Sequence, residues 1–247
     1  MIVDGLTFVG DSLFGYHATA ADLLATMDGA DIDRAVVCPV KPRTYRLARE
    51  NERVADAVRQ HGGRLVGFGR VDPLLGDEAA ADAEAALGEL GLSGLFLHPW
   101  EETFRVSASL VDAVVAVAQG RGSPVMVATG YPWLSEALQV ADLARRFPDV
   151  TFLMTTGGQL NVSGLGQTDA ELALTKNSNL LVQTTGVYRE DFLESVVSRF
   201  GAARLVFASS FPLMDARLEL LRARALHISE HERAKVLGDN LASLLQL

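Results

Sequence analysis

Three side chains that do chemistry in many enzymes stand near the ends of two short apolar segments. His98 ends the segment Gly94–His98, and Arg70 and Asp72 lie at the end of Leu65–Val71. A histidine exchanges a proton near neutral pH, and an arginine holds a carboxylate with two parallel hydrogen bonds. We name His98 and Asp72 as candidate catalytic residues and Arg70 as a candidate substrate-binding residue. Two plainer interpretations stay open, a hydrogen-bonded structural histidine and an internal ion pair between Arg70 and Asp72.

Aromatic side chains occupy two loops that follow apolar segments. The tripeptides His98-Pro99-Trp100 and Tyr131-Pro132-Trp133 contain both tryptophans of the chain. Trp100, Tyr131 and Trp133 are candidate substrate-binding residues, because flat rings can sandwich a planar ligand or cover an apolar one. A contact between two copies of the chain is the alternative, since aromatic residues are also enriched at protein interfaces.

Hydroxyl side chains end three further segments. Thr156, Thr184 and Ser210 donate hydrogen bonds to a carboxylate or carbonyl without adding charge, so they are also candidate substrate-binding residues. The alternative is that they satisfy backbone groups of nearby loops. The single cysteine, Cys38, lies in an apolar run, which favours a buried hydrophobic residue over a nucleophile.

The elements that must position these residues alternate along the chain. Short runs rich in Val, Leu, Phe and Thr predict strands that are buried on both faces. These strands are Ile2–Val9, Ala35–Val40, Leu65–Val71, Gly94–His98, Pro124–Thr129, Thr151–Thr156, Leu180–Thr185 and Leu205–Ser210. Stretches with a helical period separate them: Ala20–Ala30, Tyr45–Gln60, Asp77–Leu90, Ser107–Gln119, Leu134–Phe147, Asp169–Asn177 and Glu190–Phe200.

Several residues are expected to bound these helices. Gly62 and Gly120 suit the left-handed conformation that ends a helix, and Pro148 stops the helix before it. Ser229 and Glu232 have the spacing of a capping box that opens a final helix.

Eight strands with intervening helices, repeated about every 30 residues, predict an α/β fold of the (β/α)8 TIM-barrel type. A doubly wound sheet is the alternative. No linker or change in composition divides residues 1–247, so we expect one domain. In such a barrel the carboxyl ends of the strands share one face, which would bring the candidate residues together.

Six segments of the chain together resemble the amidohydrolase-2 (aminocarboxymuconate-semialdehyde decarboxylase-like) branch of the amidohydrolase superfamily. They are Ala30–Val37, Arg64–Pro73, Leu90–Pro99, Phe147–Phe152, Arg204–Pro212 and Val236–Asn240. The resemblance spans nearly the whole chain in the family's order. It implies the same barrel and a hydrolase or lyase activity.

The resemblance also implies a divalent metal, usually zinc, bound by histidines and an acid on strands 1, 5, 6 and 8. Those positions align with Leu6, Phe8, Ala128, Thr156 and Ser210. None of these side chains is a strong metal ligand, because zinc requires His, Cys, Asp or Glu. We therefore expect no metal and no other cofactor. A site rebuilt from relocated ligands is the alternative, and it would use Asp11, His17, Asp72 and His98.

The composition excludes several other classes of protein. The chain has a net charge of −9 and no run of Lys or Arg, so nucleic-acid binding is disfavoured. No apolar stretch reaches the ~20 residues that cross a bilayer, and no secretory signal is visible. With one cysteine no intrachain disulfide can form, and we expect a cytoplasmic location.

Three functions remain open. The first is a metal-independent enzyme that acts by acid–base chemistry on a small carboxylate- or carbonyl-containing substrate, as a hydrolase, lyase or isomerase. The second is a non-catalytic relative, a pseudoenzyme that binds a small molecule or a protein partner. The third is a metal-dependent hydrolase or decarboxylase with relocated ligands. A homodimer is compatible with each of them.

Overall fold

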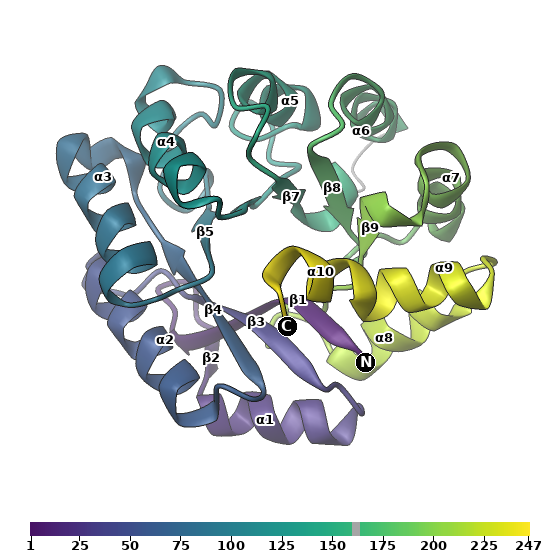
Figure 1. Cartoon of the computed structure of the whole chain (residues 1–247), viewed down its shortest axis with the longest axis horizontal. Coiled ribbons are helices and arrows are strands. Elements are labelled where there is room, and N and C mark those ends of the chain that lie inside the picture. The colour runs from purple at the N-terminus through teal and green to yellow at the C-terminus, as the bar shows by residue number, and fades with distance from the viewer. Residues whose placement is uncertain (160–163) are drawn as a thin grey trace.

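The computed structural model describes residues 1–159 and 164–247 and shows a closed ring of parallel strands surrounded by helices (Figure 1). The ring strands are β1 (Val3–Asp11), β3 (Arg34–Pro39), β4 (Leu65–Arg70), β5 (Gly94–Leu97), β6 (Val125–Val127), β7 (Phe152–Met154), β8 (Leu180–Gln183) and β9 (Leu205–Val206). Each overlaps a segment predicted to be a strand, although β1 extends two residues beyond its segment and β3 begins one residue earlier. A two-residue strand, β2 (His17–Ala18), pairs antiparallel with the end of β1 and was not predicted.

Hydrogen bonds between β1 and the residues that follow β9 close the barrel. The strands run in the order β1-β3-β4-β5-β6-β7-β8-β9. The backbone N–H of Gly5 donates to the carbonyl of Phe207 at 2.9 Å, and that of Phe8 donates to the carbonyl of Phe211 at 2.8 Å. The predicted TIM barrel is therefore confirmed, and the doubly wound alternative is wrong.

The helices cover the outside of the ring (Figure 1). They are α1 (Ala20–Gly29), α2 (Leu47–His61), α3 (Asp77–Glu84), α4 (Asp112–Arg121), α5 (Ala137–Arg146), α6 (Gly164–Lys176), α7 (Glu190–Phe200), α8 (Ala216–Ala225), α9 (Glu230–Ala234) and α10 (Asn240–Leu245). Helix α8 was not predicted.

The predicted helix ends are correct in two cases and wrong in two. The capping box of Ser229 and Glu232 is present, and α5 ends before Phe147-Pro148. Gly62 is right-handed with φ −59°, so it is not a left-handed cap. Helix α4 runs past Gly120 and ends at Arg121, and the left-handed residue that follows it is Gly122, with φ +64°. The backbone N–H of Gly122 donates to the carbonyls of Ala118 and Gln119, so this glycine, and not Gly120, caps the helix.

Large apolar side chains fill the inside of the barrel. They include Leu6, Phe8, Phe68, Phe96 and Met126, together with the fully buried Cys38. Burial raises the pKa of the Cys38 thiol, which supports the prediction of an inert hydrophobic residue. Helix α10 closes the amino-terminal end of the barrel, where it lies across the centre of the ring (Figure 1). The opposite end is therefore the open face.

A buried carboxyl group, Asp4, ties β1 to the segment after β9. One carboxyl oxygen accepts hydrogen bonds from the backbone N–H of Ser209 at 2.8 Å and of Leu6 at 3.2 Å, and the other accepts the Ser209 hydroxyl. Burial raises the pKa of Asp4 to about 6, although the bonds from Ser209 oppose that shift.

This raised pKa predicts a pH-dependent stability. Because the folded protein holds the Asp4 proton more tightly than an unfolded chain, Asp4 contributes stability below pH 4 that is lost as the pH rises to about 6. At about 1.4 kcal/mol per pKa unit the loss is about 3 kcal/mol. We expect the unfolding free energy of D4N, measured by urea denaturation, to lack this loss between pH 4 and pH 7. A D4N curve parallel to that of the natural protein would contradict the assignment, and D31N at an exposed aspartate serves as control.

No described helix is both long enough and apolar enough to cross a membrane.

Candidate active site at the mouth of the barrel

The centre of the site is Arg70, the last residue of β4 and fully buried. Asn51 of α2 holds its backbone: the Asn51 amide donates to the Arg70 carbonyl at 2.9 Å and accepts from its N–H at 2.7 Å. Nη1 of Arg70 donates to the carbonyl of Pro39 at 3.3 Å, and Nη2 contacts the carboxylates of Glu101 and Glu102. The helix layer thus fixes the strand end, and the strand end aims the guanidinium at the loop after β5.

The charges around Arg70 compensate each other. Glu102 accepts from Arg70 at 2.8 Å and lies 3.2 Å from the ammonium group of Lys41, which is also buried. Burial opposes the charge on Arg70, but Glu102 and Glu101 outweigh burial and raise the pKa of Arg70. Burial also raises the pKa of Glu102, which Arg70 and Lys41 only partly offset. Two buried cations therefore face two carboxylates, as buried charges require.

The predicted ion pair between Arg70 and Asp72 is wrong. A carboxylate oxygen of Asp72 accepts the backbone N–H of Leu74 at 3.0 Å and so caps the short 3₁₀ helix Pro73–Leu75. Although the two residues stand two apart, β4 ends at Arg70, so the chain has already turned at Asp72 and the strand alternation no longer applies.

His98 lies beside Glu101 and is almost fully buried. Its Nδ1 accepts the backbone N–H of Glu101 at 3.3 Å, and its Nε2 lies 3.7 Å from a carboxylate oxygen of the same residue. Burial, and then Arg70 and Lys41, lower the pKa of His98 well below 6.5, so the ring is neutral at pH 7. Because Nδ1 accepts a hydrogen bond, the neutral ring carries its proton on Nε2.

Aromatic rings cover this group of charges. Trp100 and Tyr131 stack on each other with centroids 5.7 Å apart and planes at 16°, and Tyr131 lies 5.4 Å from the His98 ring. Phe14 packs 5.1 Å from Trp100. The two loops therefore meet as predicted. Trp100 and Tyr131 pack against each other and leave no gap between them for a sandwiched ligand. Trp133 points away and is 77% exposed.

The three predicted hydroxyl residues bond to neighbours at the seams between strands. Thr156 donates to the carbonyl of Thr129 at 3.1 Å, and Thr184 accepts the N–H of Ala208 at 3.2 Å. The Ser210 hydroxyl bonds to that of Thr185 at 3.0 Å. The bonds of Thr156 and Thr184 to backbone groups agree with the plainer interpretation, whereas the partner of Ser210 is a side chain.

Two of these residues have unusual backbones. The φ angles of Thr156 and Ser210 are +50° and +59°, in the left-handed region that residues other than glycine rarely adopt. Both follow the last residues of barrel strands, where strained backbone often accompanies a functional site.

The residues present do not fit the metal that the resemblance implies. Leu6, Phe8 and Ala128 pack in the apolar interior and offer no donor atoms. Thr156 and Ser210 offer only neutral hydroxyls that already have partners. In the described ranges, 1–159 and 164–247, no group of three or more His, Cys, Asp or Glu is arranged to hold a metal ion.

The relocated ligands do not assemble into one site either. Asp11 of β1 and His17 of β2 lie opposite each other in the strand register, and both are exposed. His98 is buried beside Glu101, and Asp72 caps a turn.

Sequence reasoning assigned no role to Lys41, Glu101, Glu102 and Phe14. The acidic pair Glu101-Glu102, directly after His98-Pro99-Trp100, is the signal that could have revealed the partners of Arg70.

Comparisons with known proteins agree with this geometry. The family model described as Amidohydrolase matches residues 13–247. The structure of 5-carboxyvanillate decarboxylase from Sphingomonas paucimobilis is similar, with a TM-score of 0.79, 16% identity and coverage of 100% of this chain and 99% of that one. No curated protein matches the chain.

Two further structures are similar to this chain. A dihydroxybenzoic acid decarboxylase from Polaromonas, with bound manganese and the inhibitor 2-nitroresorcinol, has a TM-score of 0.78 and 15% identity, with 100% of this chain and 97% of that one covered. An uncharacterized TIM-barrel protein from Bordetella bronchiseptica has a TM-score of 0.80 and 16% identity, with 99% and 98% covered. At these identities the likeness shows the fold alone.

Proposed function

We propose, on the premise that this chain belongs to the amidohydrolase family, that residues 1–247 form one catalytic domain that needs no divalent metal. The domain acts on a small compound with a carboxylate or carbonyl group at the open end of the barrel. One observation carries the proposal: His98 and Glu101 are held together against the buried guanidinium of Arg70. This arrangement joins a hydrogen-bond donor, a carboxylate and a fixed cation within one loop and one strand end.

Each of the three groups has a role that follows from its contacts. Arg70 presents a positive charge whose fork suits a carboxylate, and Glu101 occupies it in the free protein. A substrate carboxylate that displaces Glu101 leaves that side chain free to accept a proton. His98 donates from Nε2 to an oxygen on which negative charge develops. Asp72 takes no part, because its carboxylate caps a turn.

The surroundings favour an aromatic carboxylate as substrate. Trp100 is 45% exposed and Phe14 is 44% exposed, so both offer ring surface to a planar ligand beside Arg70. The similar structures from Sphingomonas and Polaromonas are, by name, decarboxylases of aromatic acids. The residues present are consistent with an aromatic carboxylate as substrate. In this chain Arg70, and not a metal ion, would bind its carboxylate group.

Metal analysis tests the proposal directly. We expect protein purified without chelator to carry far less than one zinc or manganese per chain by elemental analysis. A panel of hydroxylated aromatic carboxylates should be converted at the same rate before and after dialysis against chelator, with products followed by mass spectrometry. Stoichiometric metal whose removal abolishes turnover would overturn the proposal and restore the metal-dependent alternative.

A second candidate, a non-catalytic binder, rests on a different observation. The cations Arg70 and Lys41 are compensated by Glu101 and Glu102, and His98 is neutral, so the site is electrostatically complete without a ligand. Thermal-shift measurements with the same panel separate the candidates. Stabilisation by a compound that is never converted supports the binder, whereas detected product excludes it.

A further inference from the structure

Lys41 carries a buried amine at the mouth of the barrel, and the chemistry proposed above gives it no role. It follows β3 by two residues, and its backbone carbonyl accepts the N–H of Leu13 at 2.8 Å. Only 7% of its side chain is exposed. Lysine is rarely buried, and its amine is the side-chain group that condenses with carbonyl compounds. A buried lysine beside the candidate active site is therefore a candidate nucleophile.

Lys41 and Arg70 share one carboxylate. The side-chain nitrogen of Lys41 lies 3.2 Å from Oε1 of Glu102, and Nη2 of Arg70 lies 2.8 Å from the same oxygen. The two nitrogens are therefore at most about 6 Å apart. A molecule whose carboxylate binds Arg70 brings the next carbon of its chain close to the Lys41 amine.

Arg70 keeps one donor for such a carboxylate. Its Nε atom is buried and has no hydrogen-bond partner among residues 1–159 and 164–247. Nε and Nη2 lie on the same edge of the planar guanidinium, and Nη2 contacts Glu101. Because buried donors rarely stay unpaired, this edge suits a carboxylate that accepts from both nitrogens and displaces Glu101.

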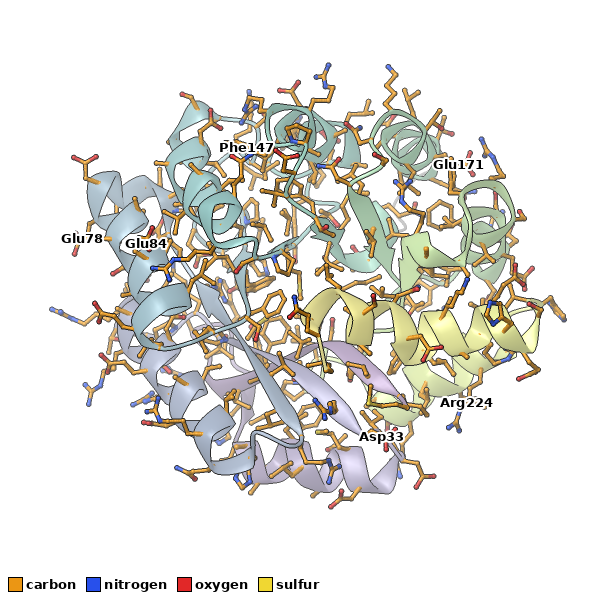
Figure 2. The ribbon with its side chains drawn as sticks, viewed as in Figure 1. Asp33, Glu78, Glu84, Phe147, Glu171 and Arg224 are labelled. Carbon is orange, nitrogen blue, oxygen red and sulfur yellow. The ribbon has the colours of Figure 1, made fainter. Side chains whose placement is uncertain are left out.

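Tyr45 covers the amine from outside. Its ring centroid lies 5.3 Å from the Lys41 nitrogen, and the residue is 64% exposed. Tyr45 also lines a cavity of about 550 Å³, together with residues of α2 and α3 that include Glu78 at the outer surface (Figure 2). The ring therefore has room to move aside, which opens a path to Lys41.

We propose that Lys41 is a nucleophile of this site and condenses with the ketone of an aromatic 2-oxo acid to form an imine. The inference rests on the proposed function, since Arg70 binds the carboxylate of this substrate. A 2-oxo acid fits because its ketone carbon is bonded directly to its carboxylate carbon, so one small molecule reaches both nitrogens. The exposed rings of Trp100 and Phe14 favour an aromatic group on it.

Glu102 is the base for this condensation. It accepts a proton from the Lys41 ammonium group across 3.2 Å, and burial, which raises the pKa of Glu102, favours the protonated carboxyl. The neutral amine then forms the C–N bond, and the carbonyl electrons move to oxygen. That oxygen leaves as water with two of the three ammonium protons, one of them delivered by Glu102. The remaining iminium keeps the positive charge of Lys41 and pairs with ionised Glu102.

Reductive trapping on the full chain tests the imine. Cyanoborohydride adds hydride to the iminium carbon, so phenylpyruvate with this reagent should leave a secondary amine on Lys41, which peptide mass spectrometry locates. Lys176 and Lys235 are the other two lysines and serve as internal controls. Accessibility alone favours the exposed Lys176. We expect at least ~10-fold more adduct on Lys41 than on either control, and equal or lower modification of Lys41 overturns the proposal.

A matched pair of variants and a second ketone define the site. K41R keeps a cation beside Glu102 but has no nucleophilic amine, so it should be stabilised by phenylpyruvate in thermal unfolding and form no adduct at position 41. K176R should form the natural amount at Lys41. Phenylacetone has a methyl group in place of the carboxylate and should label Lys41 at least ~10-fold less, relative to Lys176. Equal labelling by the two ketones overturns the role of Arg70.

The access route has its own test. Y45A should form the Lys41 adduct at least ~3-fold faster than the natural protein, because the covering ring is gone. Y188A is the control, since Tyr188 is also exposed and lies over Arg222. A rate in Y45A that is no higher than in Y188A contradicts this route.

Trapping does not depend on turnover, so its result separates the two proposals. An adduct on Lys41 without conversion of any aromatic carboxylate supports the imine and contradicts the catalytic function. Conversion of the panel by a protein that forms no adduct on Lys41 keeps that function and overturns the imine.

Discussion

Replacement of Arg70 by methionine is expected to lower the free energy of unfolding by about 3–5 kcal/mol. The guanidinium is fully buried and bonds to Glu102, whose side chain is also fully buried. Methionine fills similar space but leaves Glu102 with Lys41 as its one cation partner and removes the cation partner of Glu101. An uncompensated buried charge costs far more than the pair itself contributes. Urea denaturation at pH 7, followed by the fluorescence of the two tryptophans, measures the loss.

A matched surface pair provides the control for this prediction. Arg145 pairs with Asp142 at an exposed position, with 62% of the arginine side chain accessible. We expect R145M to change stability by less than about 1 kcal/mol, because exposed ion pairs contribute little. Removal of one acid in the same background, R70M with E101Q, should recover part of the loss. A loss of unfolding free energy below about 1 kcal/mol for R70M would show that the ion pairs of Arg70 with Glu101 and Glu102 do not stabilise the fold.

Replacement of His98 by alanine is expected to lower the rate constant for the chemical step by ~10²-fold or more. Alanine removes the Nε2–H donor, and we expect the end of β5, to which His98 is attached, to keep its position. Because burial, Arg70 and Lys41 lower the pKa of His98 well below 6.5, the ring stays neutral across the range from pH 7 to pH 8. We therefore expect the rate of the natural protein to be insensitive to His98 titration there. Steady-state kinetics on the substrate found by the panel measure both effects.

Two variants separate a chemical role of His98 from a structural one. H98N keeps an acceptor for the backbone N–H of Glu101 but loses the Nε2 donor, so it should be folded and slow. H61A changes a histidine at the end of α2 and should keep the natural rate. A normal rate in H98A or H98N would remove the proposed donor role. Binding without turnover in the natural protein would instead favour the non-catalytic candidate.

The barrel could be predicted from the sequence because its strands are buried on both faces. Continuous apolar runs such as Leu65–Val71 mark each strand, and polar helical segments mark the outer layer. Helix α8 was not predicted because its exposed face carries Leu218 and Leu221, which weaken the alternation of apolar and polar residues that marks a helix. Strand β2 was not predicted because a strand of two residues is too short to show an alternation of apolar and polar residues.

The site could be predicted only in part. Because the strand ends of a barrel share one face, the sequence predicted that Arg70, His98, Trp100 and Tyr131 lie close together. The ring contacts of the structure confirm this proximity. The sequence could not reveal that Arg70 pairs with Glu102 and not with Asp72, because that choice depends on where β4 ends. Nor could it show that Trp100 stacks on Tyr131 while Trp133 turns outward.

By itself, the order of apolar and polar residues determined that this chain forms a barrel, and the resemblance to the amidohydrolase family aligned Leu, Phe and Ala with the metal-ligand positions that it implies. Those properties depend on residue type and on the near neighbours of each residue in the chain. The pairing of buried charges and the protonation of His98 were decided only by the tertiary structure. Each of them depends on contacts between residues far apart in the chain, such as Arg70 and Glu102, which are 32 positions apart. Closure of the ring sets those distances, and local sequence does not encode them.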